Sequence, residues 1–243
     1  MLKTRGIVFR TIKYGETSVI ADIYTEEKGL HTFIAGGVRS AKSRMSFGLF
    51  QPMSVVDLVS YFKEDTKALH RIKELRAAAV YSALPFDIRR GAIALFMAEI
   101  CRKSIQEACE NQELFNFLLD NLSWLDTTPH PLANLHLHFL VGLSGLLGFQ
   151  PHSDPESDEA CYLDLKEGVY GPTPPLHQQY LSPDQSSQFR MLIQAPLDQC
   201  HALPFTRAAR KALLQKLLLF YQFHVPEFSD VHTPAILEMV MEG

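Results

Sequence analysis

Residues 4–44 read TRGIVFRTIKYGETSVIADIYTEEKGLHTFIAGGVRSAKSR, and they contain the first three predicted strands and a basic loop. β-Branched and aromatic residues gather in three short runs, separated by YGE at 14–16 and EKG at 27–29. Such runs, bounded by glycine-containing turns, are typical of β-strands joined by hairpins. Two further runs, at 49–61 and 66–75, raise the number of predicted strands to five. Five short strands suit a small closed barrel, and the OB-fold is a barrel of this kind that binds nucleic acid.

The pattern changes near Pro85, after which apolar residues recur at helical spacing. Thr206 is placed to cap the N-terminus of the last long helix. The sequence therefore predicts an α+β fold, with a five-stranded OB-fold barrel over residues 1–80 and a mainly helical domain over 81–243. A proline-rich loop and hairpin are inserted in that domain at about 150–182. The predicted helices are 89–110, 112–125, 131–147, 207–224 and 233–241.

The charge of the chain is divided unevenly along its length. Residues 1–90 carry 15 Lys and Arg against 9 Asp and Glu, whereas residues 91–243 carry 8 against 18. The net charge of −4 therefore combines a balance of +6 at the front with −10 at the back. Such asymmetry indicates that the front meets a polyanion, although chance unevenness stays open as the alternative.

The sequence argues against secretion, a membrane span and a disulfide framework. The first 20 residues carry charges throughout and have no apolar core, so no secretory signal is expected. Residues 132–149 are apolar but short for a bilayer and are interrupted by Asn134, so they predict a buried helix and no membrane partner. The four cysteines form no CxxC pair, and we expect no disulfide framework. A cytoplasmic protein with reduced thiols is therefore expected.

No catalytic motif stands out. The chain has no GxxxxGK[ST], GxGxxG, GxSxG or HExxH sequence. His136 and His138 form an HxH pair, but residues two apart on a helix point to different faces, so a shared metal is not expected. We therefore expect a protein that is not an enzyme and needs no cofactor. A metal hydrolase built on scattered histidines stays open as an alternative, and metal analysis would detect it.

The most informative local feature is a basic loop after the third predicted strand. Its cations stand among glycines and serines, which let a backbone approach phosphate closely. Further cations lie on the first strand and near the last, and we expect these strands to lie close together and form one groove. Basic residues with accompanying aromatics are typical of single-strand binding, whereas a solvated face with core aromatics is the alternative. The candidate DNA-binding residues are Arg39, Lys42, Arg44, Lys13, Arg10, Lys67, Arg71 and Tyr61.

A second basic feature lies on the last long predicted helix. Arg207, Arg210 and Lys211 are spaced at i, i+3 and i+4, so they share one helix face. Next to exposed apolar residues, such a face suits an acidic peptide with a hydrophobic end. A solvated helix face is the alternative reading of the same residues.

The order of these segments resembles the RecO family of recombination mediators. The resemblance is carried by the YGETS turn, by Thr25-x-x-x-Gly29, by the glycine-then-basic loop and by FQPMSVVDL. FMAEI, ENQELFNFLLDNLSWLD, LHFLVGLSGLLGFQP and LLLFYQFHVPEFSDVHTPAILEMV extend it over nearly the whole chain. It implies an N-terminal OB-fold and a helical C-terminal domain. It also implies binding of single- and double-stranded DNA, strand annealing, and help in loading RecA onto coated single strands at the nucleoid. The implied partners are RecR and the C-terminal tail of single-stranded DNA-binding protein.

The chain departs from this family in one region. Many members carry a four-cysteine zinc module after a G-x-x-P segment, here Gly148 to Pro151, but only Cys161 follows it nearby. We therefore expect no structural zinc. The hairpin is expected to pack through apolar contacts of Tyr162, Leu163, Leu165 and Val169. A protein-interaction scaffold whose basic front binds an acidic partner, in place of DNA, stays open as the alternative function.

Overall fold

The structure is a computed structural model of the 243-residue chain, described over residues 1–40, 45–63, 69–151 and 161–242. Its contacts group into two compact units, Met1–Thr127 and Thr128–Gly243. This division is based on how residues pack, and it places two helices in the same unit as the barrel. The domain boundary predicted from the sequence, between residues 80 and 81, follows the change from strands to helices, and it stays a prediction.

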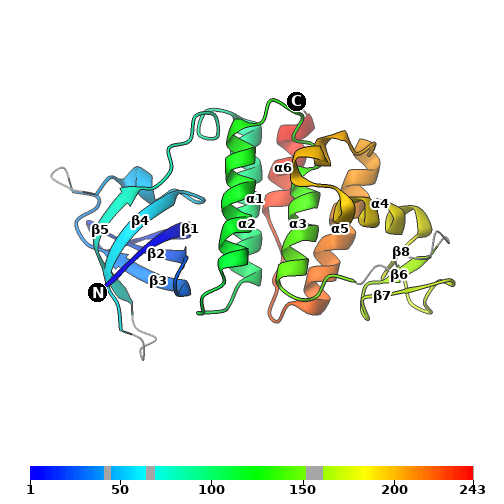
Figure 1. Ribbon diagram of the computed structural model, residues 1–243, viewed down its shortest axis with the longest axis horizontal. Helices are drawn as coiled ribbons and strands as arrows, with labels where there is room; N and C mark the ends of the chain where they lie inside the picture. The colour runs from blue at the N-terminus through cyan, green and yellow to red at the C-terminus, as the bar shows by residue number, and fades with distance from the viewer. Residues whose placement is uncertain (41–44, 64–68, 152–160, 243) are drawn as a thin grey trace. The chain divides into compact units, whose positions relative to one another are not determined.

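The first unit begins with the predicted five-stranded barrel (Figure 1). The strand order is β1-β2-β3-β5-β4, and β4 closes the barrel by pairing with β1. The β3–β5 pair is parallel and the other pairs are antiparallel. This arrangement confirms the barrel expected from the sequence. The strands are β1 (Leu2–Tyr14), β2 (Ser18–Thr25), β3 (Gly29–Ala35), β4 (Val55–Tyr61) and β5 (His70–Ala77).

Alternation along the strands builds the barrel core. On β2, Val19, Ala21 and Ile23 are buried in the interior, and the residues between them point outward. The interior of the barrel is filled by Val8, Val19, Ala21, Ile23, Phe33, Ala35, Val38, Phe50, Val56, Leu58, Ile72 and Leu75.

The predicted fourth strand begins too early. Instead of a strand from residue 49, the chain forms a 3-10 helix, η1 (Phe47–Phe50), and β4 starts only at Val55. Pro52 has no N–H for a strand ladder, and Met53 has a φ of 65°, outside the β region. The fifth strand is also shifted, because it starts at His70 and extends to Ala77.

Two helices of the first unit cover one side of the barrel. They are α1 (Ile88–Ser104) and α2 (Gln112–Thr127). Phe9 of β1 stacks on Tyr24 of β2, and Tyr24 stacks on Phe115 of α2, with centroid separations of 5.7 and 6.2 Å. The Arg5 guanidinium lies 5.4 Å from the Phe115 ring centroid. This aromatic stack fixes α2 on the barrel.

The predicted helix 89–110 is too long at its C-terminal end. α1 ends at Ser104, and the segment after it turns to the β2–β3 hairpin, where the Leu30 N–H donates to the Glu107 carbonyl at 3.1 Å. Gly29 has a φ of +69°, and a Cβ there would lie 2.4 Å from the carbonyl oxygen of Cys109. Glycine is therefore required for this close approach.

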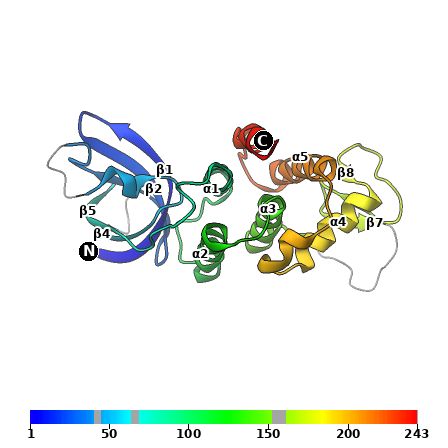
Figure 2. The ribbon, with the colours of Figure 1, turned by 90° about the horizontal axis from the view of Figure 1, so that it is seen from above.

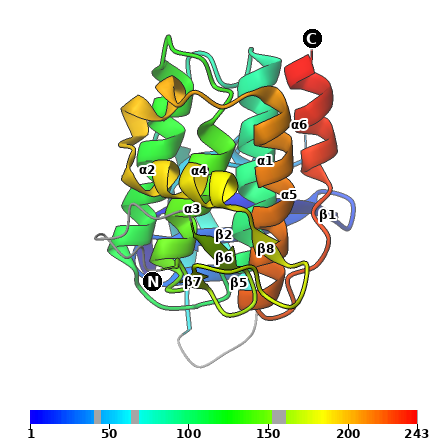
Figure 3. The same cartoon turned by 90° about the vertical axis from the view of Figure 1, so that its right-hand side faces the viewer.

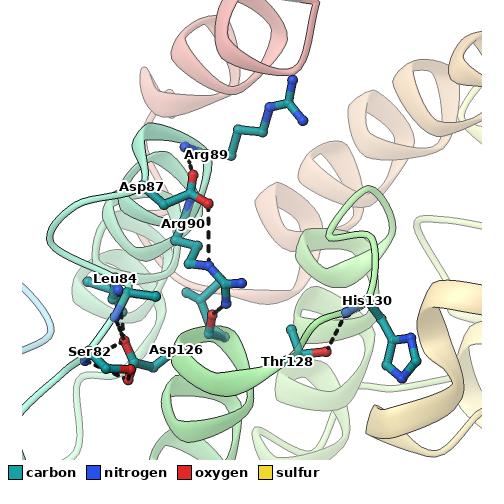
Figure 4. A network of polar contacts seen from close by, with 10 residues as sticks. Ser82, Leu84, Asp87, Arg89, Arg90, Asp126, Thr128 and His130 are labelled. Atoms are coloured by element: carbon teal, nitrogen blue, oxygen red, sulfur yellow. Dashed lines mark hydrogen bonds and ion pairs between the residues drawn. The ribbon is translucent and has the colours of Figure 1, made fainter.

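A carboxylate joins the entry of α1 to the end of α2 (Figure 4). Asp126 accepts the backbone N–H groups of Ser82, Ala83 and Leu84 at 2.7–3.1 Å, and also the Ser82 hydroxyl. Burial alone would raise the pKa of Asp126, but these donors outweigh it and hold the pKa below its usual value. Asp87 caps α1 by accepting the Arg89 N–H at 2.8 Å.

The second unit is a helical assembly with a small sheet. α3 is buried on most sides and contacts both α4 and α5. Figures 1 and 2 show α3 beside these two helices. The Tyr221 hydroxyl of α5 donates to the Leu140 carbonyl of α3 at 2.7 Å. The helices are α3 (Leu135–Leu146), α4 (Pro183–Gln194), the 3-10 helix η2 (Leu197–Ala202), α5 (Arg207–His224) and α6 (Thr233–Glu242).

The predicted hairpin forms β6 (Tyr162–Asp164) and β7 (Val169–Gly171), and β8 (Tyr180–Leu181) joins them on the other edge of β6. This sheet lies against α4 (Figure 3). Leu163 and Leu165 are buried as expected, whereas Val169 is 57% exposed, so its predicted packing role is wrong.

Polar contacts hold this hairpin together. The Asp164 side chain accepts the backbone N–H groups of Lys166 and Glu167 and pairs with the His177 ring at 3.1 Å.

Across the described part of the chain, no three His, Cys, Asp or Glu side chains are grouped to hold a metal ion. The described donors of the hairpin therefore do not fit a four-ligand zinc site, although residues 152–160 lie outside the described ranges. Nor does any described helix have the length and apolar character to cross a membrane.

Candidate nucleic-acid interface

The outer face of the barrel carries one continuous row of side chains across all five strands. Ile12 of β1 is opposite Ile20 of β2, and Ile20 is opposite Ile34 of β3. Ile34 is opposite Arg71 of β5, and Arg71 is opposite Tyr61 of β4. Because the residues that flank Ile20, Ile34 and Arg71 point into the core, the row itself points outward. We call these five residues the outer row.

Two predicted cations belong to this face. Arg71 is part of the outer row, and Arg10 lies one step along the strands, opposite Asp22. Both arginines are exposed, and neither forms an ion pair with a carboxylate among the described residues. The Asp22 side chain instead accepts the Thr32 hydroxyl at 2.8 Å. With Tyr61, which is 54% exposed, three of the predicted residues therefore share one face.

Two other predicted cations lie at the tip of the β1–β2 hairpin. Lys13 is opposite Val19, whose side chain is in the core, so Lys13 is on the opposite side of the hairpin from Ile12. Arg39 contacts the turn itself, since its N–H donates to the Thr17 carbonyl at 2.9 Å and its guanidinium to the Gly15 carbonyl at 3.4 Å. The hairpin tip is therefore basic beside the outer row.

The remaining three predicted DNA-binding residues, Lys42, Arg44 and Lys67, lie outside the described residues. The expectation that the first and last strands are neighbours is wrong. β1 pairs with β2 and β4, and β5 pairs with β3 and β4. The cations of β1 and β5 still lie on one face, because the outer row connects β1 to β5 across β2 and β3.

The aromatic residues that accompany the cations in the sequence divide between the surface and the interior. Tyr14 and Phe47 are exposed, in addition to Tyr61. Phe33 is in the core, as the alternative reading held, and Phe62 stacks on His70 at 4.2 Å. Burial lowers the pKa of His70, and the neighbouring His31 lowers it further.

Two protein-family models match the chain. The model described as Recombination protein O N terminal matches residues 1–81, and the one described as Recombination protein O C terminal matches residues 85–230. The chain belongs to the RecO family.

Full-length relatives agree with this assignment. The DNA repair protein RecO of Phocaeicola vulgatus is 33% identical over 236 residues, which cover 97% of both chains. RecO of Bacteroides fragilis is 32% identical over 241 residues, 99% of both chains. RecO of Flavobacterium psychrophilum is 30% identical over 242 residues, which cover 99% of this chain and 98% of the relative.

In this RecO-family chain, the predicted partner-binding residues lie on α5, which begins at the predicted Thr206 cap. Arg210 donates to the Phe205 carbonyl of its own helix cap region at 2.6 Å. Lys211 forms an ion pair with Glu238 of α6. Arg210 and Lys211 are thus engaged within the second unit, which weakens this helix face as a ready docking site.

The two histidines of the HxH pair are separated by the helix. His136 of α3 is buried, and burial together with the nearby Arg210 lowers its pKa to about 4. The His138 ring contacts the Ala195 carbonyl at 2.9 Å instead. As the helical spacing predicts, they face different neighbours and share no ligand position.

Ile12, Ile20 and Ile34 lie on the outer face, although the sequence did not predict them there. A signal was present, because Ile20 of β2 is apolar although it stands on the outer side of the strand with Asp22, opposite to Val19 and Ala21. A strand with one solvated face alternates between apolar and polar residues. Ile20 departs from this alternation on the outer side of β2.

Proposed function

We propose that this chain is a non-enzymatic DNA-binding recombination mediator of DNA repair. It binds single- and double-stranded DNA through the barrel, anneals complementary strands and assists the loading of RecA onto strands coated with single-stranded DNA-binding protein. Family membership over the full chain supports the repair role. The observation that supports the barrel as the DNA-binding part is its set of exposed cations without carboxylate partners among the described residues, Arg10, Lys13, Arg39 and Arg71.

The mechanism we infer is physical. Lysine and arginine side chains that neutralise phosphates release condensed counterions, and this release supplies affinity that falls with salt. The same cations screen the repulsion between two strands held near each other, which favours annealing. Arg10 and Arg71 are suited to this role because neither forms an ion pair with a carboxylate among the described residues. The activity belongs in the cytoplasm, at the nucleoid.

The partners we propose are RecR, the C-terminal tail of single-stranded DNA-binding protein and, indirectly, RecA. The Arg207, Arg210 and Lys211 face of α5 is the candidate for the acidic tail. Binding there requires Lys211 to exchange Glu238 for a carboxylate of the tail, which is feasible because an exposed ion pair is weak.

The proposal is tested by binding of labelled single-stranded DNA across a salt series. An Arg10→Ala/Arg71→Ala variant removes two cations of the outer face, and we expect weaker binding and a salt slope lower by roughly 1.4, at about 0.7 per phosphate contact. Lys3→Ala/Arg76→Ala is the matched control, since it changes exposed cations on the same two strands, away from the outer row.

The basic loop is tested separately by an Arg39→Ala/Lys42→Ala/Arg44→Ala variant, which should also lose affinity and slope together. If the parent protein fails to bind DNA even at low salt, the DNA-binding proposal is wrong. The protein-interaction scaffold, with a basic barrel that contacts an acidic protein, then takes its place.

A further inference from the structure

The outer row leaves apolar surface exposed on a strongly basic part of the chain. Ile12 is 41% exposed and Tyr61 is 54% exposed, while Ile20 and Ile34 between them are half-buried. Tyr14 extends this apolar surface at the end of β1, and it is 53% exposed. Exposed apolar side chains that are contiguous in a sheet mark a surface that binds a partner.

The same strands show what a covered apolar surface looks like. Phe9 precedes Ile12 by three residues and Tyr24 follows Ile20 by four. Both are almost fully buried, and Phe9 stacks on Tyr24, which in turn stacks on Phe115 of α2. Ile12 and Ile20 lie beyond this helical cover, on the far side of the Arg10–Asp22 pair.

The charges around the row indicate the chemistry of that partner. Arg71 is within the row and Arg10 is beside it, whereas Asp22 lies on the same face, opposite Arg10 and one step from Ile20. A carboxylate near the centre of the face repels phosphate, and the isoleucines offer phosphate no hydrogen bond. Phosphates are therefore favoured beside the two arginines, and an apolar, flat group is favoured over the isoleucines.

We propose that the outer row receives the faces of unpaired DNA bases, so that a bound single strand turns its bases toward the barrel and its phosphates toward Arg10 and Arg71. This inference rests on the proposed function and deepens it. Bases have an apolar face that stacks on aromatic and apolar side chains without regard to sequence. In a duplex the base faces are stacked on one another, so duplex DNA reaches the arginines but not the row. The row therefore distinguishes single strands from duplex.

The test compares three ligands, which are a single strand, the same strand made abasic over its central nucleotides, and the matching duplex. An Ile20→Thr/Ile34→Thr variant keeps β-branched residues but removes the apolar surface, and we expect about tenfold weaker binding of the single strand with duplex binding unchanged within twofold. The parent should bind the abasic strand about as weakly as the variant binds the normal strand. Val59→Thr is the matched control, because Val59 is a half-buried outward residue on β4 opposite Lys3.

A second variant keeps the test valid if the threonine substitutions disturb folding. Tyr61→Ala changes an exposed side chain and should also weaken single-strand binding alone, whereas Phe86→Ala, at another exposed aromatic, should not. Equal losses for single strand and duplex, or abasic binding as tight as normal binding in the parent, would overturn the inference. Failure of the parent to bind any of the three ligands would instead reject the proposed function.

Discussion

The two parts of the barrel's outer surface are built from the same strands but are completed in different ways. Along β1 and β2, Phe9 stacks on Tyr24 and Tyr24 stacks on Phe115 of α2, whereas Ile12 and Ile20 are left partly open. Both parts are apolar, so hydrophobicity alone does not separate a structural surface from a binding surface. What separates them is whether the chain itself supplies the cover.

This difference has an energetic meaning. On the covered side, the aromatic stack contributes to folding, and its loss should lower stability in every condition. On the open side, the surface gains its stabilisation only when a ligand is bound, so its loss should change binding and leave folding nearly unaltered. Substitutions on the two sides should therefore separate stability from affinity.

The largest effect is expected from Phe115→Ala on the covered side. Removing a fully buried phenyl ring leaves a cavity between α2 and Tyr24, which costs about 3–5 kcal/mol. Urea unfolding of the variant should show this loss in the free energy of unfolding. Phe86→Ala, at an exposed ring in the same unit, should change it by less than about 0.5 kcal/mol. DNA affinity per folded Phe115→Ala molecule should match the parent, and a selective loss of single-strand affinity would contradict the division of the surface.

The sequence predicted some elements of the fold and missed others. The strands were predictable because each is a short run of β-formers between turns, and Thr206 gave the start of α5 correctly. The end of α1 was not predictable from local pattern, since it depends on the Leu30 bond to Glu107 from a distant segment. α4 was missed although its capping box, Ser182 with Gln185, is visible in the sequence.

The candidate site was predicted by residue type and not by arrangement. Arg10, Arg71 and Tyr61 were predicted to bind DNA, and that role stays a prediction. The structure shows that all three are exposed, and their meeting on one face depends on the order β1-β2-β3-β5-β4. Charge and composition do not determine that order, because several barrel topologies accept the same strands. The register across three strands is a long-range property, and it alone joins Arg71 to Ile12.

A smaller effect is expected from Asp126→Asn, at the end of the helix that covers the barrel. The amide replaces a charged acceptor and turns N–H donors toward those of residues 82–84, which should cost about 1.5–3 kcal/mol at pH 7. Asp120→Asn on the exposed side of α2 is the control and should cost little.

The pH dependence gives this prediction a sign. The pKa of Asp126 is lower in the folded protein than its unfolded value of about 3.9, so its contribution is present above that pH and is lost as pH falls through the folded pKa. The gap in unfolding free energy between parent and Asp126→Asn should therefore be full at neutral pH and shrink below about pH 4. A gap that is constant from pH 7 to pH 3 would show that Asp126 does not act through its charge.

The smallest effect is expected from Glu26→Gln, at the rim between the covered surface and solvent. Glu26 accepts two hydrogen bonds from Arg5, at 2.6 and 2.8 Å, and one from Gln112 of α2 at 3.1 Å. The Arg5 bond lowers the pKa of Glu26, but both side chains are partly exposed, so the substitution should cost about 0.2–1 kcal/mol. Because exposed charges are screened, the loss should diminish in high salt, unlike that of Asp126→Asn. Glu27→Gln, the exposed neighbour, is the control, and a Glu26→Gln loss that persists unchanged at 1 M salt would show that this rim is as buried as the aromatic stack behind it.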